Sequence, residues 1–295
     1  MALSPESLYT VLLGMLFALQ ANIQDPGIPF LTVVLLLVFI LGIPHGAADA
    51  LIFYRLHHPR GLSQWLAFGG LYLSAAGAVV MTWMFSPSLF IGYLFVISAI
   101  HFGEDLEEKV GLNLRIAYGA SIIFAPALLF EQDLSLIFKA LGAGTHGPDF
   151  AELGKYIEWI ALASLCLVVL SRRAYWRVPL IRQLALPLIT LVFVKPLVGF
   201  TLYFCLWHSR LHLARLRQEG ILDRSRTTLL YLGLPVALTG MMVLGTLVYG
   251  RAIDAGALYQ ILFVGLGALT LPHFVMVLTL NPRGRADPLP PSHFK

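Results

Sequence analysis

Long apolar runs, each bounded by glycine, proline or charged residues, recur along the chain. A helix crosses the hydrocarbon core of a bilayer in about 20 apolar residues, and runs of this kind are too long for barrel strands. The pattern therefore predicts an all-α integral membrane protein, a polytopic bundle of about 8–10 transmembrane helices. The expected spans are Leu8–Ala21, Ile28–Ile43, Leu62–Phe85, Leu89–Ile100, Leu114–Phe130, Ile157–Leu170, Thr227–Tyr249 and Ala257–Leu280.

A further apolar stretch, Ile181–His212, is interrupted by Lys195 and Pro196. A proline removes one helical hydrogen bond, and a lysine is costly to place in hydrocarbon. We therefore expect two segments here, or one broken helix.

No linker or change in composition divides the chain, so we expect one membrane domain over residues 1–295. Residues 1–27 are expected to form an N-terminal helix and loop, and residues 28–281 the histidine-bearing bundle. Residues 282–295 are expected to be a disordered cytoplasmic tail. Within the bundle, Glu131–Lys155 is a polar excursion.

The composition agrees with a membrane protein. Hydrophobic residues make up 58% of the chain and charged residues 12%, and the mean hydropathy is +0.80, whereas soluble domains carry about 25% charged residues. The net charge of +4 lies mostly in short loops and no nucleic-acid motif is present, so we expect no nucleic-acid partner. Cys166 and Cys205 fall in apolar runs and are expected to be small core residues. Met1–Thr10 has no basic region, so a cleaved signal peptide is not expected.

Basic residues form four clusters between the spans, and the positive-inside rule predicts that all four are cytoplasmic. This arrangement requires Ile181–His212 to cross twice or to re-enter. It also places Glu131–Lys155 outside and both termini in the cytoplasm. The clusters are Arg55 with Arg60; Arg172, Arg173, Arg177 and Arg182; Arg215, Arg217, Arg224 and Arg226; and Arg283 with Arg285.

Nine histidines are present, and His57, His58, His146 and His293 fall in loops or the tail, where no site role is expected. The other five lie at or near the ends of apolar runs, on four separate elements that the topology above brings to one leaflet. Because ionisable residues inside a membrane are costly, their convergence predicts a shared site. These five are His45, His101, His208, His212 and His273.

The spacing of His208 and His212 favours a metal site. On a helix, residues four apart project from one face about 6 Å apart along the axis, close enough to hold one ion. For this pair alone, hydrogen bonding to neighbouring helices is the alternative. An all-imidazole set suits zinc, copper or iron. A bis-histidine haem would leave three of the five histidines unexplained.

Carboxylates follow two of these histidines at helical spacing. Asp49 and Glu104 are placed to accept the second ring N–H of the ligating His45 and His101, respectively. We expect Asp105, with Glu107 and Glu108, to be a solvated helix end instead. Aromatic residues near the histidines are expected to line a tunnel for a long apolar substrate, with an interfacial aromatic belt as the alternative. They are Phe102, Tyr203, Phe204, Trp207 and Phe274.

Four ordered motifs resemble the Brp/Blh family of bacterial and archaeal β-carotene 15,15′-dioxygenases. They are Pro44-His45-Gly46 with Asp49, His101-Phe102-Gly103, Trp207-His208-Ser209 with His212, and Pro272-His273. The resemblance runs from about Gly42 to Val277 and includes the stretch from Arg115 to Phe138.

The resemblance implies an integral membrane, non-haem iron enzyme that cleaves β-carotene centrally with O₂ into two retinals. Carried over to this sequence, it implies His45, His101, His208 and His212 as iron(II) ligands. His273 is implied as a fifth ligand or as a residue supporting the ligands. The expected partners are β-carotene and O₂ as substrates, the lipid bilayer, and a retinal-binding rhodopsin as acceptor of the product.

Two other classes remain open from the residues alone. A membrane di-iron desaturase or hydroxylase requires roughly eight histidines in HxxxH and HxxHH boxes, and this chain has one HxxxH box, at His208 to His212. A non-enzymatic metal- or retinoid-binding transporter is favoured if the break at Lys195 and Pro196 forms a site at the midplane of the membrane. Metal content separates the transporter from both enzymes.

Overall fold

The computed structural model describes residues 27–106, 110–172, 175–223, 225–249 and 254–280. The regular elements among these residues are all helices. In chain order they are α2 (Ile28–Leu37), η1 (Val38–Gly42), α3 (Ile43–His57), α4 (Leu62–Phe85), α5 (Pro87–Gly103), α6 (Leu112–Phe124), η2 (Ala125–Leu128), α7 (Glu131–Phe138), η3 (Lys139–Ala143), η4 (Gly144–His146), α8 (Gly147–Ser171), α9 (Val178–Phe193), α10 (Pro196–Leu202), η6 (Tyr203–His208), α11 (Ser209–Gln218), α12 (Arg226–Tyr249) and α13 (Ala255–Leu280).

The prediction of an all-α membrane bundle is confirmed. Within the described residues, four helical stretches are long and apolar enough to cross a membrane: Ile28–His57, Leu62–Phe85, Glu131–Ser171 and Ala255–Met276. Shorter apolar helices lie at Pro87–Gly103, Leu112–Leu128 and Leu180–Phe193, where the hydrophobic pattern also predicts spans.

The helix boundaries follow the punctuation of the sequence at most positions. The helix α4 has the predicted bounds, Leu62–Phe85. The predicted break is also present, because α9 ends at Phe193 and α10 begins at Pro196. Pro196 has no N–H to continue α9 and disfavours a helical conformation for Lys195 before it, whose ψ is 139°. The polar segment Glu131–Lys155 is itself helical over most of its length. The expected span Leu8–Ala21 and the tail 282–295 lie outside the described residues.

Several helices present leucine to the outside, as expected for contact with lipid. On α4, Leu62, Leu66, Leu71 and Leu73 are all at least 65% exposed, an arrangement that would be costly in water. Both cysteines are free; Cys205 is buried, but Cys166 is exposed on α8. The expectation of a core position is therefore wrong for Cys166, because its side of α8 faces outward.

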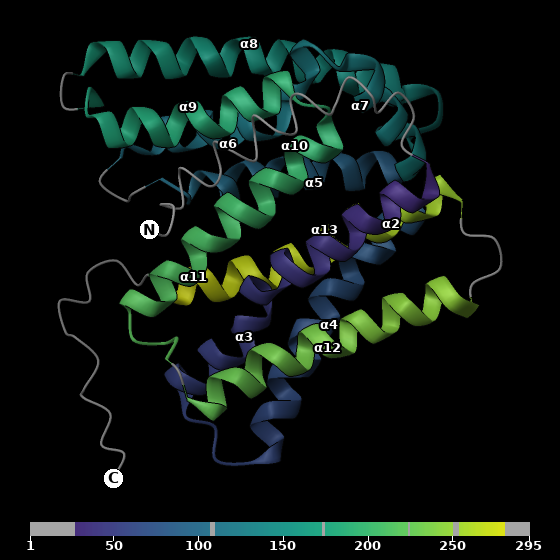
Figure 1. Cartoon of the computed structure of the whole chain (residues 1–295), viewed down its shortest axis with the longest axis vertical. Helices are drawn as coiled ribbons and strands as arrows, with labels where there is room; N and C mark the ends of the chain where they lie inside the picture. Colours follow the sequence, from purple (N-terminus) through teal and green to yellow (C-terminus); the bar gives the residue numbers. More distant parts are fainter. Residues whose placement is uncertain (1–26, 107–109, 173–174, 224, 250–253, 281–295) are drawn as a thin grey trace.

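The helix α13 runs through the middle of the molecule (Figure 1) and packs against α2, α3, α4, α5 and η3. Figure 1 shows α8 and α9 at one end of the molecule, and α12 at the other end, where it packs against α3. Contacts between α6 and α8, α5 and α6, and α4 and α5 link the two ends. The last turn of α5 and the first turn of α11 approach α13 through His101 and His212, whose rings lie 5.2 Å and 5.0 Å from that of His273.

Two glycines allow α5 and α6 to approach closely beside the end of α5. A Cβ atom on Gly119 of α6 would lie 2.8 Å from the backbone nitrogen of Gly103, and one on Gly103 would lie 2.6 Å from the carbonyl oxygen of Arg115. Small residues permit such backbone contact between membrane helices. This contact sets the position of the last turn of α5, which carries His101.

Candidate metal centre

Four of the five singled-out histidines lie together in the interior. His101 lies in the last turn of α5, His208 ends η6, His212 is on α11 and His273 is on α13, and each is at most 8% exposed. The ring centroid of His101 is 4.8 Å from that of His208 and 5.2 Å from that of His273. The rings of His212 and His273 are 5.0 Å apart. His45 lies in the first turn of α3, but its side chain is outside the described part of the structure.

Two π-helical segments lead into the histidine-bearing elements. The segment η1 immediately precedes α3, and η6 contains His208 and contacts η1. A π-turn displaces the residues that follow it around the helix axis, and such turns occur often at functional sites. The hydroxyl of Ser209 lies 2.7 Å from the carbonyl oxygen of Phe204 and 3.3 Å from that of Gly42. Ser209 thus links the two π-helical segments.

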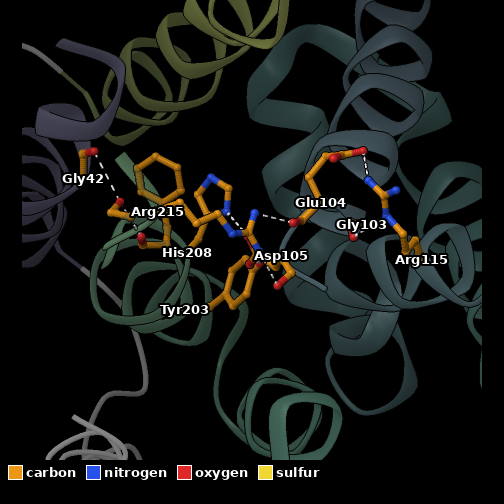
Figure 2. Close-up of polar contacts among 10 residues, drawn as sticks. Gly42, Gly103, Glu104, Asp105, Arg115, Tyr203, His208 and Arg215 are labelled. Carbon is orange, nitrogen blue, oxygen red and sulfur yellow. Dashed lines mark hydrogen bonds and ion pairs between the residues drawn. The ribbon is translucent and has the colours of Figure 1, made fainter. Parts of the chain in front are cut away.

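Asp105 holds one of these histidines. Its Oδ1 atom accepts a hydrogen bond from His208 Nδ1 at 2.8 Å, and its Oδ2 atom accepts one from the Tyr203 hydroxyl at 2.7 Å (Figure 2). Asp105 follows the end of α5, where carbonyl groups lack intrahelical donors. The guanidinium group of Arg215 donates to two of them, the carbonyl oxygens of Glu104 and Asp105. The loop that carries Asp105 is therefore fixed from α11, the helix that carries His212.

Asp49 holds a second histidine in the same way. Its Oδ1 atom lies 2.8 Å from His273 Nδ1, and its Oδ2 atom accepts a hydrogen bond of 2.9 Å from the Tyr72 hydroxyl. The side chains of Asp49 and His273 are each 3% exposed. Three helices, α3, α4 and α13, meet in this contact.

These contacts correct three sequence-based expectations. Asp49 pairs with His273 of α13, whereas the expected partner was His45. Glu104 forms an ion pair with Arg115 of α6, and the residue that pairs with a site histidine is its neighbour Asp105. The expectation of a solvated helix end is therefore wrong for Asp105, which is 4% exposed. The remaining two acidic residues, Glu107 and Glu108, lie outside the described residues.

Sequence reasoning missed Asp105 and Tyr72. A signal for Asp105 was present, because His101 precedes it by four residues, the same spacing that separates His45 from Asp49. No local signal marked Tyr72, which comes from the middle of α4 and reaches Asp49 only through tertiary packing.

An apolar cavity of about 400 Å³ lies against the histidines. His101, His273, Asp49 and Tyr72 are in its wall, and most of the remaining lining is aliphatic or aromatic. On α13 the lining extends from Phe263 to His273, which corresponds to about 15 Å along the helix axis. Such a cavity suits a long apolar molecule that is held beside a few polar groups.

The five predicted substrate-contacting aromatic residues divide into two groups. Phe102 and Phe204 line this cavity. Tyr203, Trp207 and Phe274 are not part of its wall, so substrate contact by these three stays a prediction. Tyr203 is turned to Asp105, Trp207 is buried in the core, and the ring of Phe274 lies 5.9 Å from that of His101.

The donor chemistry of these residues fits a metal ion. With Nδ1 donating to a carboxylate, His208 and His273 each carry their lone pair on Nε2, as metal-ligating histidines do when a carboxylate orients them. The Nδ1 atom of His101 is buried and makes no hydrogen bond to the described residues. Imidazoles that share one ion have ring centres about 4.5–5.5 Å apart, since metal–nitrogen bonds are about 2 Å long. Within the described residues, no three side chains form a ready-made metal site, and the side chain of His45 is not among them.

The remaining histidines lie apart from this cluster where the structure describes them. The ring of His57 stacks on Phe53 at the end of α3, and His58 follows it with a φ of 44°. His146 pairs with the exposed Asp149 at the start of α8. His293 lies outside the described residues. No site role was expected for these four.

Comparisons with known proteins identify relatives over most of the chain. Residues 36–281 match a family described as "Beta-carotene 15,15'-dioxygenase". A protein of that name from the uncultured marine bacterium 66A03 is 26% identical over 259 residues, covering 82% of this chain and 91% of the relative. The "Probable beta-carotene 15,15'-dioxygenase Blh" of Halobacterium salinarum is 28% identical over 286 residues, covering 82% of this chain and 81% of the relative. No solved structure matches the chain.

Proposed function

Because the chain belongs to the β-carotene 15,15′-dioxygenase family, we propose that it cleaves β-carotene with O₂ at the central double bond into two molecules of retinal. The observation that carries this proposal is the placement of His101 and His273 in the wall of an apolar cavity within the helix bundle. The reaction is balanced without a reductase, because both atoms of O₂ end in the two new carbonyl groups and the alkene supplies the electrons.

We propose iron(II) as the cofactor, held by His45, His101, His208 and His212. When bound, iron(II) supplies the binding and activation of O₂, which does not react with a closed-shell alkene at a useful rate unaided. The protein's part is to hold the imidazoles in place. Asp105 orients His208, and Tyr203 and Arg215 hold Asp105.

The cavity provides the site for the carotenoid. Phe102 and Phe204 lie in its wall near the histidines, and Phe263 and Leu141 lie farther along it. These side chains offer no hydrogen bonds, so they would hold a polyene by apolar contact and shape alone. Water is excluded by the same surface, which protects the reacting carbon atoms from side reactions. A substrate dissolved in the bilayer can reach a cavity within the membrane laterally.

We propose a cell-membrane location with both termini in the cytoplasm, and release of retinal to a retinal-binding rhodopsin. The four basic clusters support this orientation. Reporter enzymes fused after Arg60, Arg182 and Arg285 should read cytoplasmic, and one fused at Gly144 should read external. A reporter after Arg182 that reads external would contradict this orientation.

The proposal is tested in cells that accumulate β-carotene. Expression of the chain under air should bleach the orange colour and yield extractable retinal. His101→Ala should retain the colour at equal membrane abundance, whereas His146→Ala, at an exposed histidine, should bleach like the wild type. Wild-type cells that stay orange, with iron available and no retinal extractable, would contradict carotenoid cleavage.

A further inference from the structure

The same spacing of histidine and aspartate occurs twice in the chain. His45 precedes Asp49 on α3, and His101 precedes Asp105 at the end of α5, by four residues in each case. Each aspartate contacts a histidine of a different element. Asp105 reaches His208, which is 103 positions away, and Asp49 reaches His273, which is 224 positions away.

The two contacts use the same atoms and have the same third member. In both, Oδ1 of the aspartate meets Nδ1 of the histidine at 2.8 Å, and Oδ2 accepts a hydrogen bond from a tyrosine hydroxyl. The tyrosines are Tyr203 of η6 and Tyr72 of α4, which come from different parts of the chain. The repeated arrangement is therefore not the consequence of one local sequence pattern.

We propose that His273 is a fifth histidine ligand of the metal, held in place by Asp49 and Tyr72 as positioning residues. The inference rests on the proposed iron site, since His208 is one of the proposed ligands and His273 is oriented as His208 is. The neighbours of His273 agree with this role. Its ring lies 5.2 Å from that of His101 and 5.0 Å from that of His212, so it is adjacent to two of the proposed ligands.

The energetic cost of this arrangement also points to a function. Asp49 and His273 are almost completely buried, and a carboxylate removed from water carries a large desolvation penalty that its partners must offset. Ionisable groups kept inside a membrane mark functional sites. A carboxylate that accepts the Nδ1 proton of a ligating histidine fixes the tautomer of the ring and raises the basicity of Nε2. Tyr72 holds Oδ2, so that Oδ1 remains directed at His273.

His273 also differs from His208 and His212 in its relation to the cavity. His273, Asp49 and Tyr72 line the cavity together with His101, whereas His208 and His212 are not part of its wall. The inferred ligand therefore belongs to the side of the metal site that faces the substrate. A change in the contact between Asp49 and His273 should therefore affect both metal binding and carotenoid binding.

Metal binding by the purified full-length protein tests the proposal without reference to activity. The protein is stripped of metal in detergent and titrated with iron(II) or cobalt(II) against a competing chelator. Asp49→Asn should weaken binding about 10–100-fold, the range typical for residues that orient ligands. Tyr72→Phe should weaken it about fivefold, as expected for one hydrogen bond. Tyr93→Phe is the matched control, because the Tyr93 hydroxyl donates to the carbonyl oxygen of Gly267, away from the histidines, and it should bind metal like the wild type.

His273→Ala gives a direct test of ligation. It should weaken binding by at least about tenfold, change the visible absorption spectrum of the bound cobalt(II), and regain affinity when free imidazole is added. A structural role would not produce rescue by imidazole. Wild-type affinity and an unchanged cobalt spectrum in His273→Ala would overturn the proposal, as would a loss of affinity that imidazole does not restore.

Two further outcomes keep this inference separate from the proposed function. If His273→Ala does not fold, Asp49→Asn and Tyr72→Phe decide the matter, and wild-type affinity in both would overturn the proposal. Retinal formation is measured independently on the wild type. A wild-type protein that binds metal through His273 but forms no retinal would contradict the cleavage reaction while supporting the ligand.

Discussion

The close contact between α5 and α6 predicts that replacing the glycine at position 119 by alanine, which adds one methyl group, destabilises the fold. Gly119→Ala would place a Cβ atom 2.8 Å from both the carbonyl carbon of Ala99 and the backbone nitrogen of Gly103, and closer still to the oxygen of Ala99. The distance to Gly103 is roughly 0.6 Å short of ordinary contact, and every clashing atom belongs to the backbone, so no side chain can rotate away. The helices must separate.

The cost can be estimated from known overpacked cores. An extra methyl group in a tightly packed interior costs about 1–3 kcal/mol, and a backbone clash belongs at the upper end. The better helix propensity of alanine returns at most about 1 kcal/mol. We therefore expect a net loss of about 2 kcal/mol, which lowers the melting temperature by roughly 5 °C in a protein of this size. Because Ala99 and Gly103 flank His101, retinal formation should also fall.

The assay is thermal unfolding of the purified protein in detergent, together with metal content and retinal formation. Gly92→Ala on α5, the helix against which Gly119 packs, is the control, because a Cβ atom there meets nothing within 4 Å, and it should melt like the wild type. If Gly119→Ala melts within about 1 °C of the wild type, which corresponds to less than about 0.5 kcal/mol, the close approach of α5 and α6 is refuted.

Three further predictions concern the metal, the cavity and the loop before α12. Purified protein should hold close to one iron per chain, and two irons per chain in the wild type would indicate a di-iron enzyme. His208→Ala or His212→Ala should lower the iron content sharply, because a lost ligand leaves the metal labile. Cys166→Ala and Cys205→Ala should leave the iron content unchanged. Ser98→Trp, which fills the cavity near His101, should reduce retinal formation while the iron content stays constant. The control Ser164→Trp on α8 should change neither retinal formation nor iron content. Full activity in Ser98→Trp would exclude this cavity as the carotenoid site. The hydroxyls of Ser225 and Thr228 hold the pKa of Asp223 well below its ordinary value, so ionised Asp223 stabilises the fold above that ordinary pKa, and this contribution is lost as the pH falls. The difference in melting temperature between wild type and Asp223→Asn should therefore be largest near neutral pH and narrow below about pH 4. A difference that stays constant with pH would show that Asp223 does not act through its charge.

The hydrophobic pattern was sufficient to predict much of the fold. Apolar runs punctuated by glycine, proline and charge located α4 to the residue, and the position of Pro196 located the break between α9 and α10. These features depend on local chemistry, namely the length of a run and the missing N–H of proline. The π-helical segments η1 and η6 could not be predicted in this way, because an apolar run looks the same whether the helix closes its hydrogen bonds at i+4 or i+5.

For the candidate site, the sequence indicated which histidines to consider but not how they are held. The cost of burying an ionisable group singled out the interior histidines, and the structure places four of them together. The carboxylate partners were assigned to the nearest histidine on the same helix, and that choice was wrong for Asp49 and Glu104. Which carboxylate meets which ring depends on how distant helices pack, as the separation of 224 positions between Asp49 and His273 shows.

Product analysis of the purified, iron-loaded protein tests the proposed reaction most directly. Supplied with β-carotene and O₂, the wild type should form two molecules of retinal for each β-carotene consumed, since cleavage of the central double bond gives two identical C20 aldehydes. His212→Ala, prepared and loaded in the same way, should form none. A single longer apocarotenal in place of retinal would contradict central cleavage, and unchanged β-carotene under air with iron bound would contradict the proposed reaction altogether.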